Sequence, residues 1–569
     1  MAKNPWLEFK DHKEIIKGEW PTIAEMFEVS LKKFPDRPCF TVIEKEKHTI
    51  TYKEEHKEIL KAAALILSAG LKKGDKVLLN GKNSREWATA YLAAQFAGCV
   101  ICPMDNQMPI ERVAELGEFA ECKFIFADFD ILEKLSNLNN AWFENINGKC
   151  LLLGKSEKYP KVYNLDIEPL EKKVEVSEYD MAAVLFTSGT TGNEKGAMLT
   201  QRNLTSNAYQ AADGFTVDET DTLYALLPLH HSYCCTAVLL ESVMHGAECL
   251  FGHGIIISRM LNDLKKGHVT VFMGIPLLYN KLLAGIEKKL EAKGAFVNGL
   301  MKNLMNFNIW CKLKFKKAPL NKFFAKKILS QLGLDHTKVL ICGAGPLSPE
   351  VFKKYQALGL NFLQGYGLTE TAPILTLNPT EHFKLDSVGR VLAFIDMKIA
   401  EPNAEGIGEI RVKGPNVCLG YLKDKEHTDE LFDEEGYLKT GDLGYLDDEN
   451  YLYLKGRSKN IIVTEGGKNV FPEEIEDMFQ LFTDIDQILI RGYQAKPGVP
   501  SEKIEAVIHL SEDYTKATPD KDEQRKHVEE IIDGINKKLA AYKKIEKITI
   551  LEEAMEMTTT KKIKRRTVK

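Results

Sequence analysis

The chain has 569 residues, 44% of them hydrophobic and 28% charged, which is the composition of a globular protein. At ~150 residues per domain, this length predicts roughly three to four domains' worth of chain. The net charge of −5 gives no general electrostatic reason to bind nucleic acid. No apolar leader and no run of about 18 apolar residues occurs, so we expect neither a secretion signal nor a transmembrane helix.

The first 180 residues alternate helical periodicity with short apolar runs, which predicts a parallel sheet with crossover helices. Further short apolar runs continue this pattern downstream. The predicted helices cover residues 59–69 and 87–98, and the predicted strands cover 76–79, 99–103, 270–273 and 339–342.

The sequence pattern changes after about residue 386, where short strands separated by Gly, Pro and Asp turns predict a compact β region. A small mixed α/β unit follows residue 457. We therefore predict an α/β fold with a large N-terminal domain, residues 1–458, built from parallel αβ subdomains plus a β-rich subdomain. A small α+β C-terminal domain would span residues 459–569.

The eleven cysteines show no disulfide framework, which suits a reducing compartment such as the cytoplasm. Cys99 and Cys102 form a CxxC pair inside the apolar run CVICPM, without a second pair nearby. This pattern indicates buried strand thiols more than a redox or metal site. The adjacent Cys234 and Cys235 are interpreted as core residues.

A basic segment spans residues 301–330, with eight lysines, no acidic residue and interleaved aromatic side chains such as Phe307 and Trp310. A helix of this kind can lie on an anionic membrane surface. The alternative is a solvated insertion that covers the body of the protein.

The run LFTSGTTGNEKGAML is the most informative in the chain, because eight of the ten residues 187–196 are Gly, Thr, Ser or Lys. Glycine lets the backbone approach an anion, hydroxyl groups donate to phosphate oxygens, and Lys195 supplies positive charge. The spacing argues against a P-loop, which has Gly directly before its Lys and Ser or Thr directly after it, because here Glu194 precedes Lys195 and Gly196 follows it. A Gly/Thr-rich surface turn is the alternative to a phosphate site.

Five segments and a basic tail occur in a characteristic order: TSGTTGNEKG (187–196), GAGPL (343–347), QGYGLTET (364–371), TGD (440–442), GRSKNIIVTEGGKNVFPEEIE (456–476) and KKIKR near the end. Together they resemble the adenylate-forming superfamily over nearly the whole chain. Within that superfamily, the chain most resembles bacterial long-chain fatty-acyl-CoA synthetases. The resemblance implies that ATP activates a carboxylate as an acyl-adenylate, with release of pyrophosphate, before a thiol displaces AMP.

The resemblance assigns most of these motif residues to ATP. The segment 187–196, called the phosphate-grip motif below, would bind the β- and γ-phosphates. The Tyr366 ring and the opposing loop 343–346, called the adenine-wall loop below, would enclose adenine. These residues are Thr187, Ser188, Gly189, Thr190, Thr191, Gly192 and Lys195 for the phosphates, and Gly343, Ala344, Gly345, Pro346, Tyr366 and Gly367 for the base.

Carboxylates and one hydroxyl are assigned to the remaining parts of ATP. Asp442 would accept hydrogen bonds from the ribose hydroxyls, with Arg457 nearby. Thr369 would contact the α-phosphate, and Glu370 would hold Mg²⁺. A helix cap is the alternative for the Glu-Thr pair.

Lys562 falls on the catalytic lysine of the superfamily and would bridge the acid and the α-phosphate. The usual pattern is P-x-T-x-x-G-K-I-x-R, from which this chain departs because Glu556 replaces Pro and Lys561 replaces Gly. A simple basic tail that binds lipid or nucleic acid is the alternative.

The resemblance places Lys459 at a hinge about which the C-terminal domain rotates between the two half-reactions. Gly466 and Gly467 would then let the pantetheine arm of CoA pass. His231 corresponds to a residue between the ATP and acyl sites. The apolar run 236–246 suits an alkyl-chain wall. The alternatives are a surface lysine in a linker for Lys459, a packed core histidine for His231 and a buried helix for residues 236–246.

We therefore predict an AMP-forming acyl-CoA ligase that uses ATP, Mg²⁺, CoA and a medium- or long-chain fatty acid, without a nucleic-acid partner. An acyl-carrier-protein ligase, with a separate carrier protein as thiol acceptor, is the nearest alternative. A nucleotide-binding regulator with degenerate catalysis is another. We expect a cytoplasmic protein, with peripheral contact at the inner face of a membrane as an additional hypothesis.

Overall fold

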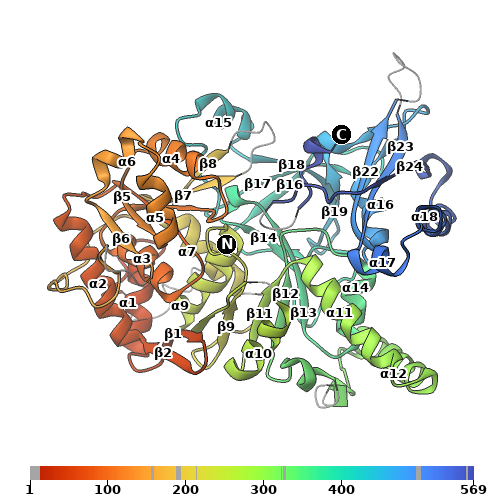
Figure 1. Cartoon of the computed structure of the whole chain (residues 1–569), viewed down its shortest axis with the longest axis horizontal. Helices are drawn as coiled ribbons and strands as arrows, with labels where there is room; N and C mark the ends of the chain where they lie inside the picture. The colour runs from red at the N-terminus through yellow and green to blue at the C-terminus, as the bar shows by residue number, and fades with distance from the viewer. Residues whose placement is uncertain are drawn as a thin grey trace.

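The computed structural model describes residues 13–154, 159–187, 194–212, 214–254, 256–321, 323–324, 328–494, 502–558 and 562–568. Two large sheets with flanking helices occupy the first two thirds of the chain, followed by a β region and a smaller α/β part. Figure 1 shows this order from red at the N-terminus to blue at the C-terminus.

The first large sheet has six strands in the order β6-β5-β3-β4-β7-β8, all parallel except the β7–β8 hairpin. Its inner strands are almost continuously apolar, as expected for a parallel sheet that is covered on both faces. The strands are β3 (Lys76–Asn80), β4 (Val100–Met104), β5 (Cys122–Ala127), β6 (Cys150–Leu152), β7 (Met181–Thr187) and β8 (Lys195–Thr200). The associated helices are α2 (Tyr52–Ser68), α3 (Arg85–Phe96), α4 (Ile110–Phe119), α5 (Phe129–Ser136) and α6 (Ala141–Ile146).

The second large sheet has nine strands in the order β15-β14-β13-β12-β11-β9-β10-β1-β2, parallel from β13 to β1 and antiparallel at both edges. The strands are β1 (Pro38–Ile43), β2 (Lys47–Thr51), β9 (Thr222–Ala225), β10 (Glu248–Phe251), β11 (Val271–Gly274), β12 (Val339–Cys342), β13 (Phe362–Gly367), β14 (Ile374–Leu377) and β15 (Arg390–Val391). The helices nearby in sequence are α1 (Ile23–Lys33), α7 (Gln201–Ala212), α8 (Ser232–Cys234), η3 (Cys235–Leu240), α9 (Glu241–His245), α10 (Ile257–Gly267), α11 (Pro276–Glu291), α12 (Ala295–Phe315), η4 (Leu329–Leu332), α14 (Pro349–Ala357) and η5 (Thr369–Thr371).

The expected β region forms a four-stranded antiparallel sheet. Its strands are β16 (Asp396–Ala400), β17 (Gly408–Lys413), β18 (Leu438–Leu446) and β19 (Leu452–Arg457), with α15 (Lys425–Leu431) between β17 and β18. Its hydrophobic residues, such as Ile410 and Leu438, pack into the same core as the two large sheets.

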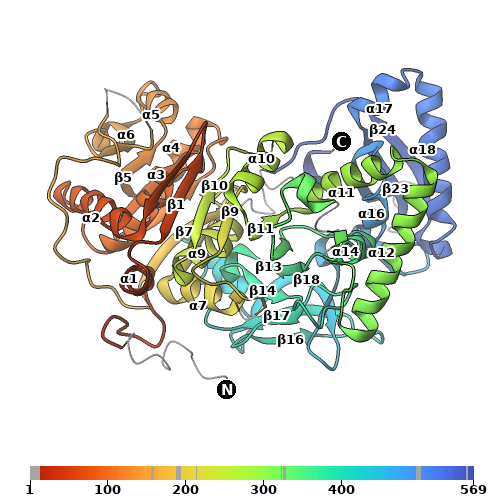
Figure 2. The ribbon, with the colours of Figure 1, turned by 90° about the horizontal axis from the view of Figure 1, so that it is seen from below.

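Residues after 457 build a smaller unit around a core of their own, which includes Ile475, Ala506 and Val528. A three-stranded sheet and α18 enclose this core, with α18 at the outer edge of the molecule (Figure 2). The elements are η6 (Ser458–Asn460), β20 (Ile462–Val463), β21 (Asn469–Val470), α16 (Pro472–Glu476), η7 (Asp477–Phe479), β22 (Ile485–Tyr493), β23 (Lys503–Leu510), α17 (Glu512–Ala517), α18 (Lys521–Asn536), η8 (Ala541–Lys543), β24 (Ile545–Leu551) and η9 (Arg565–Thr567). The domain boundary between residues 458 and 459 stays a prediction.

All eleven cysteines are buried, and Cys99 and Cys102 are at most 1% exposed, as the strand-thiol interpretation predicts. Within the described ranges, no group of three or more His, Cys, Asp or Glu side chains is arranged to hold a metal ion. In the same ranges, no helix combines the length and the hydropathy needed to cross a bilayer.

Candidate nucleotide and acyl site

A large cleft of about 2920 Å³ opens where the second sheet, the β region and the small C-terminal part meet. Ordinary ligand pockets have roughly 300–1,000 Å³, so this cleft has room for more than one substrate. Its walls include residues of the predicted motifs from five stretches of the chain, at 341–350, 364–370, 438–442, 454–460 and 557–567.

The phosphate-grip motif begins and ends in the β7–β8 hairpin. Thr187 ends β7 and is paired with Lys195, the first residue of β8, and both line the cleft. The Lys195 Nζ atom lies 5.1 Å from the centre of the Tyr421 ring. The predicted phosphate ligands Ser188, Gly189, Thr190, Thr191 and Gly192 lie outside the described residues.

A polar cluster on the cleft wall joins the half-buried Tyr366, the buried Asp442 and the exposed Arg457. The Tyr366 hydroxyl donates to Asp442 Oδ2 at 2.7 Å, and Arg457 Nε lies 2.9 Å from Asp442 Oδ1. Asp442 and Arg457 are paired in register across β18 and β19, which fixes their distance. The Asp442 carboxylate raises the pKa of Arg457, and burial raises the pKa of Tyr366. The structure thus brings three predicted nucleotide ligands into direct contact.

Glu370 lies on the short helix η5, directly after β13. Its Oε1 atom accepts a hydrogen bond from the Tyr421 hydroxyl at 2.7 Å, and burial raises the pKa of that tyrosine. Thr369 Oγ1 lies 3.5 Å from Ser232 Oγ. Gly367 is required by packing at this turn, because a Cβ atom there would stand 1.8 Å from the Pro373 carbonyl oxygen. This close turn aims Thr369 and Glu370 into the cleft.

The loop after β12 contains the predicted adenine wall. Ala344 adopts φ +63°, a left-handed conformation that is uncommon outside glycine. A Cβ atom at Gly343 would meet the Tyr233 ring at 2.9 Å. Gly343, Ala344, Gly345 and Pro346 all line the cleft beside Tyr366 and Gly367.

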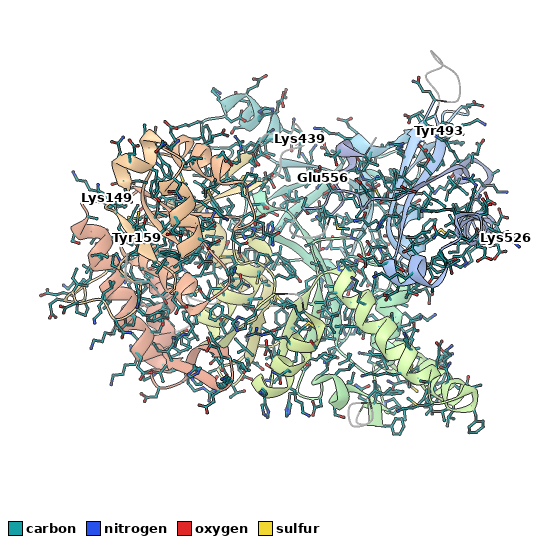
Figure 3. The ribbon with its side chains drawn as sticks, in the orientation of Figure 1. Lys149, Tyr159, Lys439, Tyr493, Lys526 and Glu556 are labelled. Atoms are coloured by element: carbon teal, nitrogen blue, oxygen red, sulfur yellow. The ribbon has the colours of Figure 1, made fainter. Side chains whose placement is uncertain are left out.

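Lys562 reaches the same cleft from the far end of the chain. Its backbone N–H donates to Thr558 Oγ1 at 3.1 Å, and its carbonyl accepts from the Thr558 N–H, so a narrow turn presents the side chain. Lys562 keeps access to solvent, yet the surrounding protein and the Arg457 charge lower its pKa, while Asp442 opposes that shift. Figure 3 shows Glu556 of this segment toward the middle of the molecule, whereas Lys526 of α18 lies at the edge.

His231 lines the cleft and packs against His230, with ring centroids 4.3 Å apart. Burial, with a smaller contribution from His230, lowers the pKa of His231 to about 3. The ring is therefore neutral at physiological pH. Lys562 also contributes to that shift, which places it within electrostatic range of His231.

The run 236–246 is mainly core. Of these residues only Ala237 lines the cleft, and Val238 to Val243 are at most 1% exposed. Its one acid, Glu241, lies 3.4 Å from His245, and burial raises its pKa. The apolar wall of the cleft instead combines Ala237 with residues from other elements, namely Ala211, Phe215, Ile275, Leu377 and Val388.

Lys459 lines the cleft within η6, and the neighbouring Ser458 donates to the Gly441 carbonyl at 3.1 Å. Gly466 and Gly467 occupy a tight turn in which the Gly467 N–H donates to the Thr464 carbonyl at 2.8 Å. Neither glycine is among the residues that line the cleft. The structure therefore does not bring the predicted CoA-passage loop to the nucleotide site.

Two site residues, Tyr421 and Gln480, were not predicted from the sequence. Gln480 bridges to the adenine-wall loop, because its Oε1 accepts from the Ser348 N–H at 2.8 Å and its Nε2 donates to the Pro346 carbonyl at 3.1 Å. Neither residue belongs to a motif with a distinctive spacing, so their roles emerge only from the fold.

The chain is similar to known proteins over most of its length. It is 26% identical to the long-chain-fatty-acid–CoA ligase ACSBG1 of Rattus norvegicus, over 84% of this chain and 70% of that one. It is 29% identical to human ACSBG2, over 80% and 72%. The solved structure of ATP-bound MatB from Rhodopseudomonas palustris shares the fold, with a TM-score of 0.75, 24% identity and coverage of 96% and 98%.

The family model described as AMP-binding enzyme matches residues 27–422. This stretch contains the phosphate-grip, adenine-wall and Thr369–Glu370 motifs, and both the α/β fold and the superfamily predicted from them are confirmed. The chain belongs to the AMP-binding enzyme family.

Proposed function

We propose that the protein is an ATP-dependent, AMP-forming ligase that joins a fatty acid to CoA. The observation that carries this proposal is the meeting of Asp442, Arg457, Glu370 and Lys562 around one cleft. Two curated relatives are named long-chain-fatty-acid–CoA ligases, which supports the same substrate class.

In the first half-reaction, a carboxylate oxygen of the acid attacks the α-phosphorus of ATP, and pyrophosphate leaves with the bridging oxygen. Asp442 would accept from the ribose hydroxyls, while Tyr366 and the loop from Gly343 to Pro346 enclose the base. Lys195 and the grip residues would hold the phosphates that leave. ATP is a substrate here, and its Mg²⁺ would neutralise charge on the phosphates.

Glu370 is suited to hold Mg²⁺, because a carboxylate oxygen is the ligand that this hard cation prefers. The Tyr421 hydroxyl orients the carboxylate through Oε1. Thr369 would donate to the α-phosphate. Lys562 lies within electrostatic range of Asp442, and it would bridge the acid and the α-phosphate as negative charge builds up there.

In the second half-reaction, the CoA sulfur attacks the acyl carbonyl carbon, AMP leaves with the carboxylate oxygen, and the thiol proton passes to solvent. The turn with Gly466 and Gly467 lies outside the cleft, so another orientation of the C-terminal domain would be needed to present it. We propose that residues 459–569 rotate about Lys459 for this step.

The acid is proposed to be a medium- or long-chain fatty acid. Ala211, Phe215, Ala237, Leu377 and Val388 give the cleft an apolar wall from several elements. Each buried CH₂ group contributes about 0.8 kcal/mol, so such a wall favours alkyl chains over short acids.

The test is a pyrophosphate-release screen over carboxylic acids of increasing chain length, with CoA, with a phosphopantetheinylated carrier protein, or with no acceptor. Acid-dependent release that becomes catalytic on adding CoA is the expected result. If turnover occurs only with the carrier protein, the carrier rather than CoA is the thiol acceptor. If no acid causes release of pyrophosphate, the proposed ligase activity is refuted. A cytoplasmic location is proposed with it, and fractionation of cells would test that part.

A further inference from the structure

Helix α12 presents a row of large apolar side chains to solvent. Seven of the fourteen large hydrophobic residues that are exposed in the described part of the chain fall between Phe296 and Phe323. Phe296 is 85% exposed, Phe307 51% and Trp310 49%. Phe296, Leu300, Phe307 and Trp310 are separated by three, four or seven residues, so they follow one face of the helix.

The opposite face of α12 is fixed to the body of the protein. The Asn308 side-chain amide donates to the Ala357 carbonyl at 3.0 Å. Lys312 is buried, and its Nζ atom donates to Gln356 Oε1 at 2.6 Å and to the Leu360 carbonyl at 3.1 Å. These bonds hold α12 against α14 and the loop after it, so the apolar row is exposed by the packing rather than by a frayed end.

The exposed aromatic rings gather around a lysine. Trp310 lies 6.2 Å from Phe307 and 5.4 Å from Phe315, measured between ring centroids. The Lys314 Nζ atom lies 5.2 Å from the Trp310 ring and 5.5 Å from the Phe315 ring. A lysine that covers an aromatic cluster can keep its charge in water while its stem extends over apolar surface.

The segment that carries this face has positive charges and no negative ones. Residues 292–334 contain no Asp or Glu, although the whole chain has a net charge of −5. Lys302, Lys314, Lys316 and Lys317 are exposed on or next to α12. Lys312, by contrast, is turned inward and does not belong to this surface.

We propose that this face of α12, defined by Phe296, Leu300, Phe307, Trp310, Phe315 and the four exposed lysines, docks on an anionic phospholipid bilayer. Aromatic residues enter the headgroup region and lysines pair with acidic lipids, which matches this composition. Figure 1 shows α12 at an outer edge of the molecule. This inference goes beyond the proposed ligase function and does not depend on it.

The test is flotation of the full chain with phosphatidylcholine vesicles, with or without phosphatidylglycerol. We expect binding only to the anionic vesicles, decreasing with salt. Changing Lys302, Lys314, Lys316 and Lys317 to Gln should weaken this binding at least about tenfold, since each lysine near an acidic leaflet contributes about fivefold. The matched control changes Lys45, Lys53, Lys57 and Lys537, which are also exposed, to Gln and should bind like the unaltered chain.

A second measurement reports on the apolar row. Among the tryptophans in the described residues, Trp310 is exposed, whereas Trp20, Trp87 and Trp142 are buried. A blue shift of tryptophan emission on adding anionic vesicles should therefore be reduced in Trp310→Phe. Trp310→Ser should also reduce flotation, while Tyr179→Ser, at an exposed aromatic elsewhere, should not.

Three results would overturn the proposal. They are an absence of flotation with anionic vesicles, equal losses in the patch and control lysine variants, and a concentration-dependent dimer that Trp310→Ser abolishes without any vesicle binding. The last result would make this face a contact between two copies of the chain.

Discussion

Replacing Gln480 with Ala should slow adenylation selectively, because this side chain ties the C-terminal part to the adenine-wall loop. Its amide makes two bonds to backbone groups of that loop, at Ser348 and Pro346. Each such bond contributes a net ~0.5–1.5 kcal/mol, so the pair stabilises the orientation that presents Lys562 by about 1–3 kcal/mol. The equilibrium between orientations would shift by about 5- to 150-fold.

The assay compares two half-reactions of the same variant. Acid-dependent pyrophosphate release should decrease by a factor within that range, and thiolysis of supplied acyl-adenylate should be unchanged or faster. The matched control is Asn536→Ala, because the Asn536 amide makes two comparable bonds to Ile545, at 3.0 and 2.9 Å, entirely within the C-terminal part. It should lower the melting temperature without changing the ratio of the two rates. Equal losses in both half-reactions of Gln480→Ala, or no loss in either, would refute the reasoning.

Four other predictions concern single residues. Lys562→Ala should abolish acid-dependent pyrophosphate release but spare thiolysis of supplied acyl-adenylate, and equal loss of both would remove its assigned role. Tyr366→Phe should raise the KM for ATP several-fold or more, because the buried Asp442 carboxylate loses its hydrogen bond from the Tyr366 hydroxyl. A hydrogen bond to a charged group contributes ~1.5–3 kcal/mol. An unchanged KM would contradict this prediction. Burial raises the pKa of Glu55 to about 7, so the stability this group provides is present below its unfolded value of 4.5 and is lost as pH rises through 7. Urea unfolding at several pH values should show that the free energy of unfolding decreases by about 3 kcal/mol over this pH range, and that Glu55→Gln abolishes the decrease. Parallel plots of unfolding free energy against pH for the two proteins would contradict this prediction. The pKa of His231 is lowered to about 3, so this ring is neutral over the pH range in which the enzyme is assayed. His231→Phe should therefore leave the acidic limb of the pH profile of kcat/KM unchanged. A displaced acidic limb would show that His231 titrates in that range.

Much of the fold was predictable because it is encoded locally. The alternation of helical periodicity and apolar runs predicted parallel sheets, and β3, β4, β11 and β12 begin or end within a residue or so of the expected strands. The change to short strands and turns near residue 386 predicted the antiparallel sheet β16–β19. Strand order was not predictable, since it depends on pairings between segments that are distant in the chain.

The candidate site was predictable only as a set of residue types. Motifs identified Tyr366, Asp442 and Glu370, but Tyr366 and Asp442 are 76 residues apart in the chain and lie in different sheets. Only the tertiary structure brings the Tyr366 hydroxyl to 2.7 Å from Asp442 Oδ2. Tyr421 and Gln480 belong to no motif, because their contacts depend on where the backbone of another element passes.

The sequence by itself determined the chemistry available to this protein: a phosphate grip, a series of ordered carboxylates and lysines, and a lysine-rich segment without acids. These follow from residue type and spacing, which the chain carries without folding. Only the tertiary structure decided which of these groups share a cleft and which face outward. Lys312 and Lys314 illustrate this, because one is buried against Gln356 while the other covers exposed aromatic rings. The physical reason is that burial and partners are set by packing between elements, and a helix alone does not specify which of its faces will be covered.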